Sequence, residues 1–239
     1  LHMPLQAALP MQRLPVLTAV SAVFVGTALC NVTNYPTNLV SLRLESLGLS
    51  GTAPSYTVDS SPLSSGLLLL STCVIPALVE EFLFRGVILR SLMRFGAGTA
   101  ILISAFLFAL MHGNVAQIVF AFPLGVLFAL FVVRTGNIWI TIAIHFLNNL
   151  FSSLYLVIEA AAGMDAVNMY SMLFPPILWV LGIAGLLYLL LRSRGTFFRL
   201  PAAPALLAPG QKGSALFGNP GMILFLCFTA VSCVLYLVS

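Results

Sequence analysis

Long apolar runs, separated by short polar segments, make up most of this chain. A helix needs roughly 20 apolar residues to cross a membrane, and seven runs meet or approach that length. Turn signals at Gly113-Asn114 and Gly136-Asn137 separate the central runs and indicate closely connected helices. The predicted spans are residues 14–34, 63–93, 97–113, 115–133, 137–159, 170–191 and 219–238.

The regions between and within these runs carry prolines that predict local irregularity. Residues 35–62 are predicted to be a polar loop, and residues 193–218 a second loop rich in Pro, Ala and Gly. The second run is too long for a simple span, and Pro76 inside it predicts a kink. Pro123, in the fourth run, is a second place where the backbone is expected to open space between helices.

Composition assigns the chain to the membrane. It is 60% hydrophobic and only 7% charged, with a mean hydropathy of +1.09, whereas soluble domains carry about 25% charged residues. The alternation typical of membrane barrels is absent, so we expect an all-α, polytopic, multi-pass helical bundle. Residues 1–239 are predicted to form a single membrane domain without a separate soluble domain.

The basic residues lie at span ends, which makes them a topology signal and argues against nucleic-acid binding. With the N-terminus inside, Arg43 is the only basic residue placed outside the membrane on the external side. This bias predicts seven spans with the N-terminus in the cytoplasm and the C-terminus outside. The basic residues placed inside are Arg13, Arg90, Arg94, Arg134, Arg192, Arg194, Arg199 and Lys212.

Adjacent glutamates, Glu80 and Glu81, interrupt the second apolar run. A carboxylate at this depth costs several kcal/mol, so such residues indicate a functional site by default. Glu81 and Arg85 are four residues apart and share a helix face, so they are expected to pair. Glu80 is rotated by about 100° from them. We therefore expect structural roles for Glu81 and Arg85 and a chemical role for Glu80; the alternative is a purely structural ion pair.

Two later spans carry histidines at a similar predicted depth. At ~1.5 Å per helical residue, Glu80 and His112 both lie roughly 22 Å from the turn at Gly96. His145 and Asn149 lie about 14 and 20 Å from the turn at Gly136, with Asn148 as a rival to Asn149. Matched depth on three helices predicts that these polar groups form one site.

The three motifs are Glu80-Glu81-x-x-x-Arg85, Phe108-x-x-x-His112 and His145-x-x-x-Asn149. Their order resembles that of the CAAX-processing and bacteriocin-processing (CPBP, or Abi) family of intramembrane proteases. The resemblance implies an intramembrane endopeptidase whose catalytic core spans residues 65–155. It implies that Glu80 is the general base on a water, assisted by His112, and that His145 and Asn149 bind the oxyanion. Glu81, Arg85 and Phe108 would be supporting residues.

Other chemistries remain open at this point. Glu80, His112 and His145 are of types that suit catalytic zinc with an open fourth position, although the HExxH pattern is absent. We expect glutamate chemistry without a metal cofactor and keep zinc as the alternative. Buried Glu/His chains also serve proton- or ion-coupled transporters. A non-catalytic membrane scaffold is the third possibility.

The expected partners follow from the membrane site. The substrate is predicted to be a membrane-embedded or lipidated peptide or protein, with the lipid bilayer as the second partner and no role for nucleic acid. The small size of the chain favours a prokaryotic plasma membrane.

Overall fold

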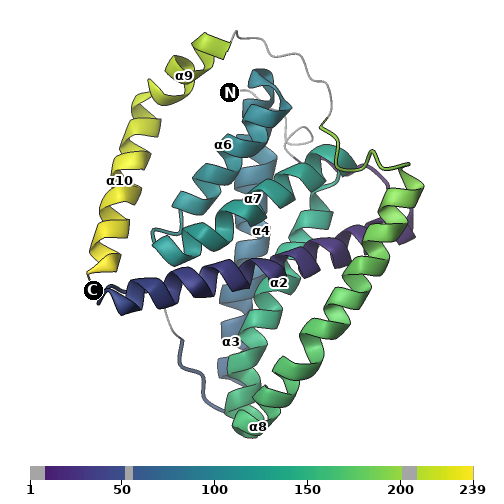
Figure 1. Cartoon of the computed structure of the whole chain (residues 1–239), viewed down its shortest axis with the longest axis vertical. Coiled ribbons are helices and arrows are strands. Elements are labelled where there is room, and N and C mark those ends of the chain that lie inside the picture. The colour runs from purple at the N-terminus through teal and green to yellow at the C-terminus, as the bar shows by residue number, and fades with distance from the viewer. Residues whose placement is uncertain (1–8, 52–55, 201–208, 239) are drawn as a thin grey trace.

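The computed structural model describes residues 9–51, 56–200 and 209–238, which form a helical bundle (Figure 1). The all-α prediction is therefore confirmed. The elements are α2 (Val16–Ser46), α3 (Pro62–Leu69), the π-helix η1 (Leu70–Val74), α4 (Ile75–Glu81), the π-helix η2 (Phe82–Ile88), α5 (Leu89–Leu92), the 3₁₀ turn η3 (Met93–Phe95), α6 (Ala97–Leu110), α7 (Val115–Thr135), α8 (Ile138–Arg192), α9 (Pro209–Phe217) and α10 (Pro220–Leu237).

Among the described residues, five helical stretches are long and apolar enough to cross a membrane: α2, the run Pro62–Phe95, α7, α8 and α10. The apolar helix α6 has only 14 residues. Helix α8 consists of two arms that meet at Gly163, where the chain reverses (Figure 1). The two arms correspond to the predicted spans 137–159 and 170–191. Gly163 has a φ of 78°, which glycine adopts without steric cost.

Both predicted loops are partly wrong. Residues 35–46 continue α2 through Pro36. A proline has no N–H to donate within the helix, and membrane helices tolerate this where hydroxyl groups bind the backbone carbonyls nearby. Here the Thr37 hydroxyl donates to the carbonyl of Thr33 at 2.8 Å. Residues 209–217 of the second predicted loop form the short helix α9.

The irregularity predicted at Pro76 takes the form of two π-helical segments, η1 and η2, on either side of α4. A π-helical turn shifts hydrogen bonding from i+4 to i+5 and is frequent at functional sites. The short helix α4 carries Pro76, Glu80 and Glu81. Both glutamates are thus held in a stretch whose register differs from that of a regular helix.

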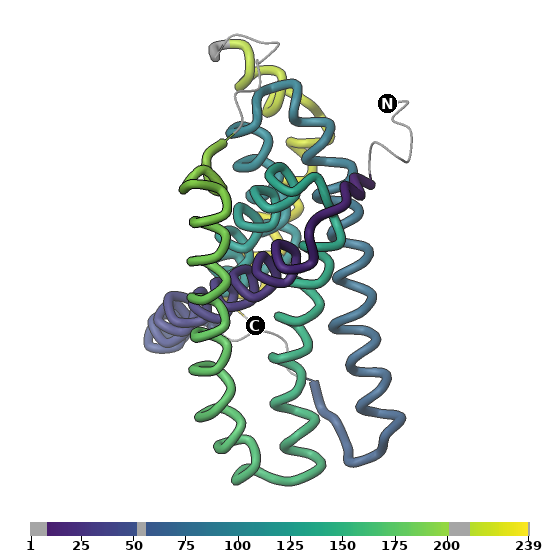
Figure 2. Tube along the Cα trace, turned by 90° about the vertical axis from the view of Figure 1, so that its right-hand side faces the viewer, coloured from purple at the N-terminus to yellow at the C-terminus, as the bar shows by residue number. Residues whose placement is uncertain are grey.

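Helix α2 crosses both arms of α8 obliquely (Figures 1 and 2). Small residues allow this close approach. A Cβ atom on Gly185 would lie 2.9 Å from the Ser21 carbonyl oxygen, and Ser21 and Ala22 are buried. Gly185 lies on the second arm of α8. On the first arm, which carries His145 and Asn149, Ile144 packs so closely on Gly26 of α2 that an added Cβ atom would clash with it.

Two turns of the bundle lie at opposite ends of its long axis. The reversal between the two arms of α8 is at one end, and the turn that leads into α6 is at the other (Figures 1 and 2). The acids Glu159 and Asp165, predicted to be external, flank the first turn. Which end faces the cytoplasm stays a prediction.

Candidate active site

A fully buried ion pair lies at the centre of the site. Nη1 of Arg85 donates to Oε1 of Glu81 at 2.9 Å, and both side chains are 0% exposed. Nη2 of Arg85 donates to the carbonyl of Gly125 on α7 at 3.4 Å. The guanidinium carbon lies 4.3 Å from the ring centre of Phe108 and 5.0 Å from that of Phe128. The pair predicted from the four-residue spacing is present and is enclosed by α6 and α7.

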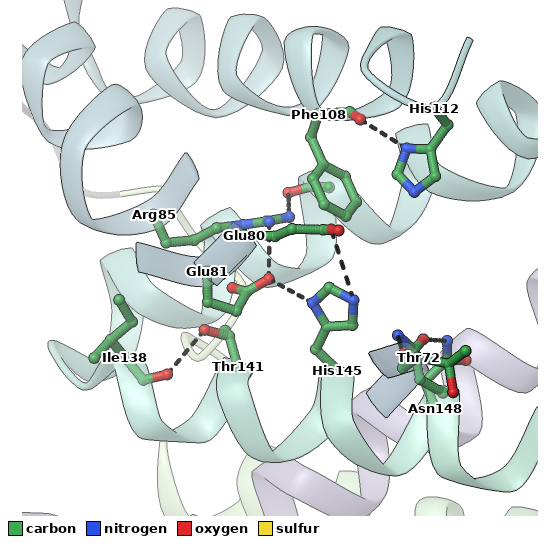
Figure 3. Close-up of polar contacts among 12 residues, drawn as sticks. Thr72, Glu80, Glu81, Arg85, Phe108, His112, Ile138, Thr141, His145 and Asn148 are labelled. Atoms are coloured by element: carbon green, nitrogen blue, oxygen red, sulfur yellow. Dashed lines mark hydrogen bonds and ion pairs between the residues drawn. The ribbon is translucent and has the colours of Figure 1, made fainter. Parts of the chain in front are cut away.

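His145, on α8, contacts both glutamates. Its Nδ1 lies 3.0 Å from Oε1 of Glu81, and its Nε2 lies 3.9 Å from Oε2 of Glu80 (Figure 3). An ionised carboxylate only accepts hydrogen bonds, so Nδ1 is the donor to Glu81. The distance of 3.9 Å is too long for a hydrogen bond. Nε2 of His145 and the Glu80 carboxylate therefore both remain available to a substrate or a water.

The two glutamates differ in accessibility. The Glu80 side chain is 22% exposed, whereas that of Glu81 is fully buried. Figure 3 shows the Glu80 carboxylate pointing towards the space between the imidazoles of His112 and His145. The rotation expected between neighbouring helical residues thus separates a paired carboxylate from an accessible one.

His112 follows the end of α6, and its orientation is set by its own helix. Its Nδ1 lies 2.9 Å from the carbonyl oxygen of Phe108. A carbonyl only accepts, so Nδ1 carries the proton and Nε2 is the free lone pair of the neutral ring. The Phe108 ring lies edge-on to His112, with ring centres 5.2 Å apart. Phe108 therefore positions His112 through both its backbone and its ring.

Asn149 is tied to the π-helix η1. Its Nδ2 donates to the carbonyl of Thr72 at 2.8 Å, and its Oδ1 accepts from Nδ2 of Asn148 at 3.0 Å. One turn further along α8, the hydroxyls of Ser153 and Thr72 lie 2.9 Å apart. Sequence reasoning missed Thr72 and Ser153. The four-residue spacing from Asn149 to Ser153 was the one available signal, since it places both on one helix face.

One cavity of about 340 Å³ brings the predicted residues together. Residues from the three motifs line it, along with polar groups from η1, α7 and α8. The convergence predicted from helix depth is thus present in the structure. The motif residues in its wall are Glu80, Phe108, His112, His145 and Asn149.

The side chains that could bind a metal ion are not clustered in the described part of the chain. No three His, Cys, Asp or Glu side chains among the described residues are grouped so as to hold a metal ion. The zinc alternative at Glu80, His112 and His145 therefore gains no support from this geometry, and the absence of a metal cofactor stays a prediction.

The comparison with protein families supports the same part of the chain. Residues 62–151 match the family described as type II CAAX prenyl endopeptidase Rce1-like. This match supports a relationship of the segment to the CAAX-type intramembrane protease family. At the level of that family, the match supports a CAAX-type intramembrane endopeptidase. The apolar helices, together with the match, support an integral membrane protein. No curated protein and no solved structure matches the chain.

All three motifs lie inside the segment that matches the Rce1-like family. The predicted core of residues 65–155 covers nearly the same stretch. Helices α2 and α10 and the second arm of α8 lie outside it.

Proposed function

We propose that this protein hydrolyses a peptide bond of a membrane-embedded or lipidated substrate with a water activated by Glu80. The observation that supports this most directly is the contrast between the two acids. Glu81 is buried and paired with Arg85, whereas Glu80 is partly exposed in a cavity that also contains both histidines. A general base must reach its water, and Glu80 meets this condition because it is partly exposed and its Oε2 has no hydrogen-bond partner among the described residues.

The charges of the site suit this role. The proposed mechanism takes both glutamates as ionised and His145 as doubly protonated, so that Arg85 and His145 bring the sum to zero. When Glu80 takes a proton from the attacking water, the site gains one positive charge while the substrate gains one negative oxyanion. The total stays at zero throughout, which matters in a low-dielectric setting where an uncompensated charge is costly.

His112 is the second participant in handling the water. Because its Nδ1 donates to the Phe108 carbonyl, its Nε2 faces the reaction as an acceptor that orients the water beside Glu80. After the attack, the proton held by Glu80 or His112 passes to the leaving amine as the C–N bond breaks. The products are a carboxylic acid and an amine, with the water's oxygen on the acyl carbon.

His145 and Asn149 supply the donors for the oxyanion. Nε2–H of a protonated His145 is not used by Glu80, because 3.9 Å is too long. The Asn149 amide uses one N–H for the Thr72 carbonyl and its oxygen for Asn148, which leaves its second N–H for the substrate. Donors fixed before the reaction stabilise a developing negative charge at little reorganisation cost.

The proposed mechanism uses no metal ion. The proposed location of the protein is a prokaryotic plasma membrane. The substrate would carry its scissile bond into the cavity from within or near the bilayer, as a lipid-anchored or membrane-embedded peptide does.

The test uses purified protein and two substrates, a prenylated CAAX peptide and a membrane-anchored peptide library. Glu80→Gln, His112→Ala and His145→Ala are expected to abolish or strongly reduce cleavage. Glu159→Gln, which changes an exposed carboxylate outside the cavity, serves as the matched control and should cleave like the wild type. Equal cleavage by all variants would remove the proposed site and favour transport or scaffolding.

A further inference from the structure

A second, smaller cavity adjoins the catalytic one. Its volume is about 50 Å³, and it shares Asn148 and Ser152 with the wall of the larger cavity. The smaller cavity lies between α2 and the two arms of α8, which place apolar residues along most of their length. Its polar lining residues are Thr27, Asn31, Asn34, Asn148, Ser152 and Tyr155.

Amides on α2 are costly in a membrane helix unless their hydrogen bonds are made. Oδ1 of Asn31 accepts from Nε1 of Trp179 at 3.0 Å, so this oxygen is satisfied by the protein. Asn34, one turn later, makes no side-chain hydrogen bond within the described residues. Its half-buried amide lines the small cavity, where a bound water would satisfy it.

The size of the cavity suits water. A water molecule occupies about 30 Å³ of liquid and needs two to four polar partners. The cavity of about 50 Å³ therefore has room for at least one water, and polar groups line it.

Hydrogen-bonding groups continue from this cavity to the catalytic residues. Ser152 donates to the carbonyl of Asn148 at 3.2 Å, and Nδ2 of Asn148 donates to Oδ1 of Asn149 at 3.0 Å. The Asn148 oxygen is left as an acceptor at the boundary of the two cavities. A water bound beside Asn34 thus adjoins Ser152 and Asn148, which also line the cavity that contains Glu80.

We propose that the small cavity is a water-retention site that supplies the hydrolytic water while a peptide fills the catalytic cavity. This proposal rests on the proposed function, since each turnover consumes one water. A lipidated or membrane-embedded substrate displaces water from the larger cavity and leaves bulk solvent distant. The water bound beside Asn34 then replaces the displaced water, and the helices need not separate to admit it.

The experiment combines kinetics with radiolytic hydroxyl labelling, which marks side chains next to bound water. Asn34→Leu replaces the amide with an apolar side chain of similar size, and Asn34→Ser keeps a polar group. Val32→Leu, on the exposed apolar side of α2, is the matched control. We expect Asn34→Leu to lower kcat several-fold without changing KM and to reduce labelling of Tyr155. Asn34→Ser and Val32→Leu should retain wild-type kcat and labelling.

Several results would overturn the proposal. One is wild-type Tyr155 labelled no more than Tyr188, which lies outside both cavities. A second is an Asn34→Leu protein with unchanged kcat or unchanged labelling of Tyr155. A third is a loss of kcat in Asn34→Ser equal to that in Asn34→Leu, which would indicate a structural role for Asn34. If Asn34→Leu does not fold, Ser152→Val repeats the test at the boundary. The labelling does not depend on activity, so it distinguishes failure of this proposal from failure of the protease assignment, which Glu80→Gln tests.

Discussion

His145 donates from Nδ1 to Oε1 of Glu81 over 3.0 Å, linking α8 to a helix 64 residues earlier. The same oxygen accepts from Arg85 at 2.9 Å. Glu81 therefore holds an arginine and a histidine with one oxygen. The second acid of the pair thus orients the His145 ring in addition to pairing with Arg85.

Glu81→Gln is expected to damage stability, whereas Glu80→Gln is expected to damage activity alone. Removing one partner of a buried ion pair leaves the other charge unpaired and costs about 3–5 kcal/mol. Arg85 would be that charge, because it is fully buried. Glu80 has no hydrogen-bonded partner at Oε2, so its neutral replacement should unfold at or slightly above the wild-type temperature. Thermal unfolding in detergent, measured beside peptide cleavage, checks both.

Equal destabilisation by the two substitutions would contradict this division of roles. So would normal cleavage by a folded Glu80→Gln protein. The two variants control for each other, since each removes one carboxylate charge from adjacent positions on α4.

Arg85→Lys is expected to be destabilising although it conserves the charge. Lysine has no planar fork, so it cannot keep the bonds to Glu81 and to the Gly125 carbonyl while stacking on Phe108. The loss of a charged hydrogen bond and a cation–π contact amounts to about 1–3 kcal/mol. The midpoint of thermal unfolding measures it, with Arg43→Lys on the exposed end of α2 as the control. A midpoint equal to that of the wild type would show that charge alone suffices.

Asn149→Ala and Ser153→Ala separate two roles of α8. Both lose a bond to Thr72 of the π-helix η1, to its carbonyl and its hydroxyl respectively. Only Asn149 also has a proposed oxyanion donor, and removing such a donor costs about 10²–10³-fold in kcat. We expect Asn149→Ala to lose kcat on that scale and Ser153→Ala to keep most of it. Steady-state kinetics on folded protein decides, and similar kcat values for the two variants would reduce Asn149 to a structural tie.

Chelation should leave activity unchanged. Glu80, His112 and His145 do not form a metal-binding group among the described residues, and the proposed mechanism uses water, carboxylate and imidazole alone. The measurement is elemental analysis of purified protein together with cleavage after treatment with a chelator. Stoichiometric zinc together with chelator-sensitive cleavage would refute the metal-free mechanism; a known metallopeptidase treated in parallel confirms that the chelator works.

Much of the site could be predicted because helical geometry is periodic. The four-residue spacings of Glu81 with Arg85 and of Phe108 with His112 each produced a contact in the structure. Depth along a helix, at ~1.5 Å per residue, also predicted which spans share a cavity. These inferences use only local geometry and the membrane as a reference.

The parts that were missed depend on irregular backbone and on packing between distant segments. The π-helices beside α4 have no reliable sequence signal, so the Thr72 carbonyl could not be predicted as the partner of Asn149. Helix α2 continues past Pro36 because nearby hydroxyls bind its backbone, whereas proline alone predicts a break. The bond from His145 to Glu81 required the rotation of α8 about its axis, which spacing within one helix does not give.

Gly125→Ala is expected to disturb the contact between α6 and α7. A Cβ atom at this position would lie 2.8 Å from the Cα of Ala105, and backbone cannot move aside as a flexible side chain can. The Gly125 carbonyl also accepts from Arg85, so a shift of α7 would stretch that bond. Overpacking of this kind costs about 1–3 kcal/mol. Gly66→Ala in α3 is the matched control, because nothing lies within 4 Å of its added methyl group. It should leave the unfolding temperature unchanged or raise it, since alanine favours a helix by up to about 1 kcal/mol over glycine. Thermal unfolding of both variants measures the difference, and equal midpoints would show that α6 and α7 separate without cost at this point.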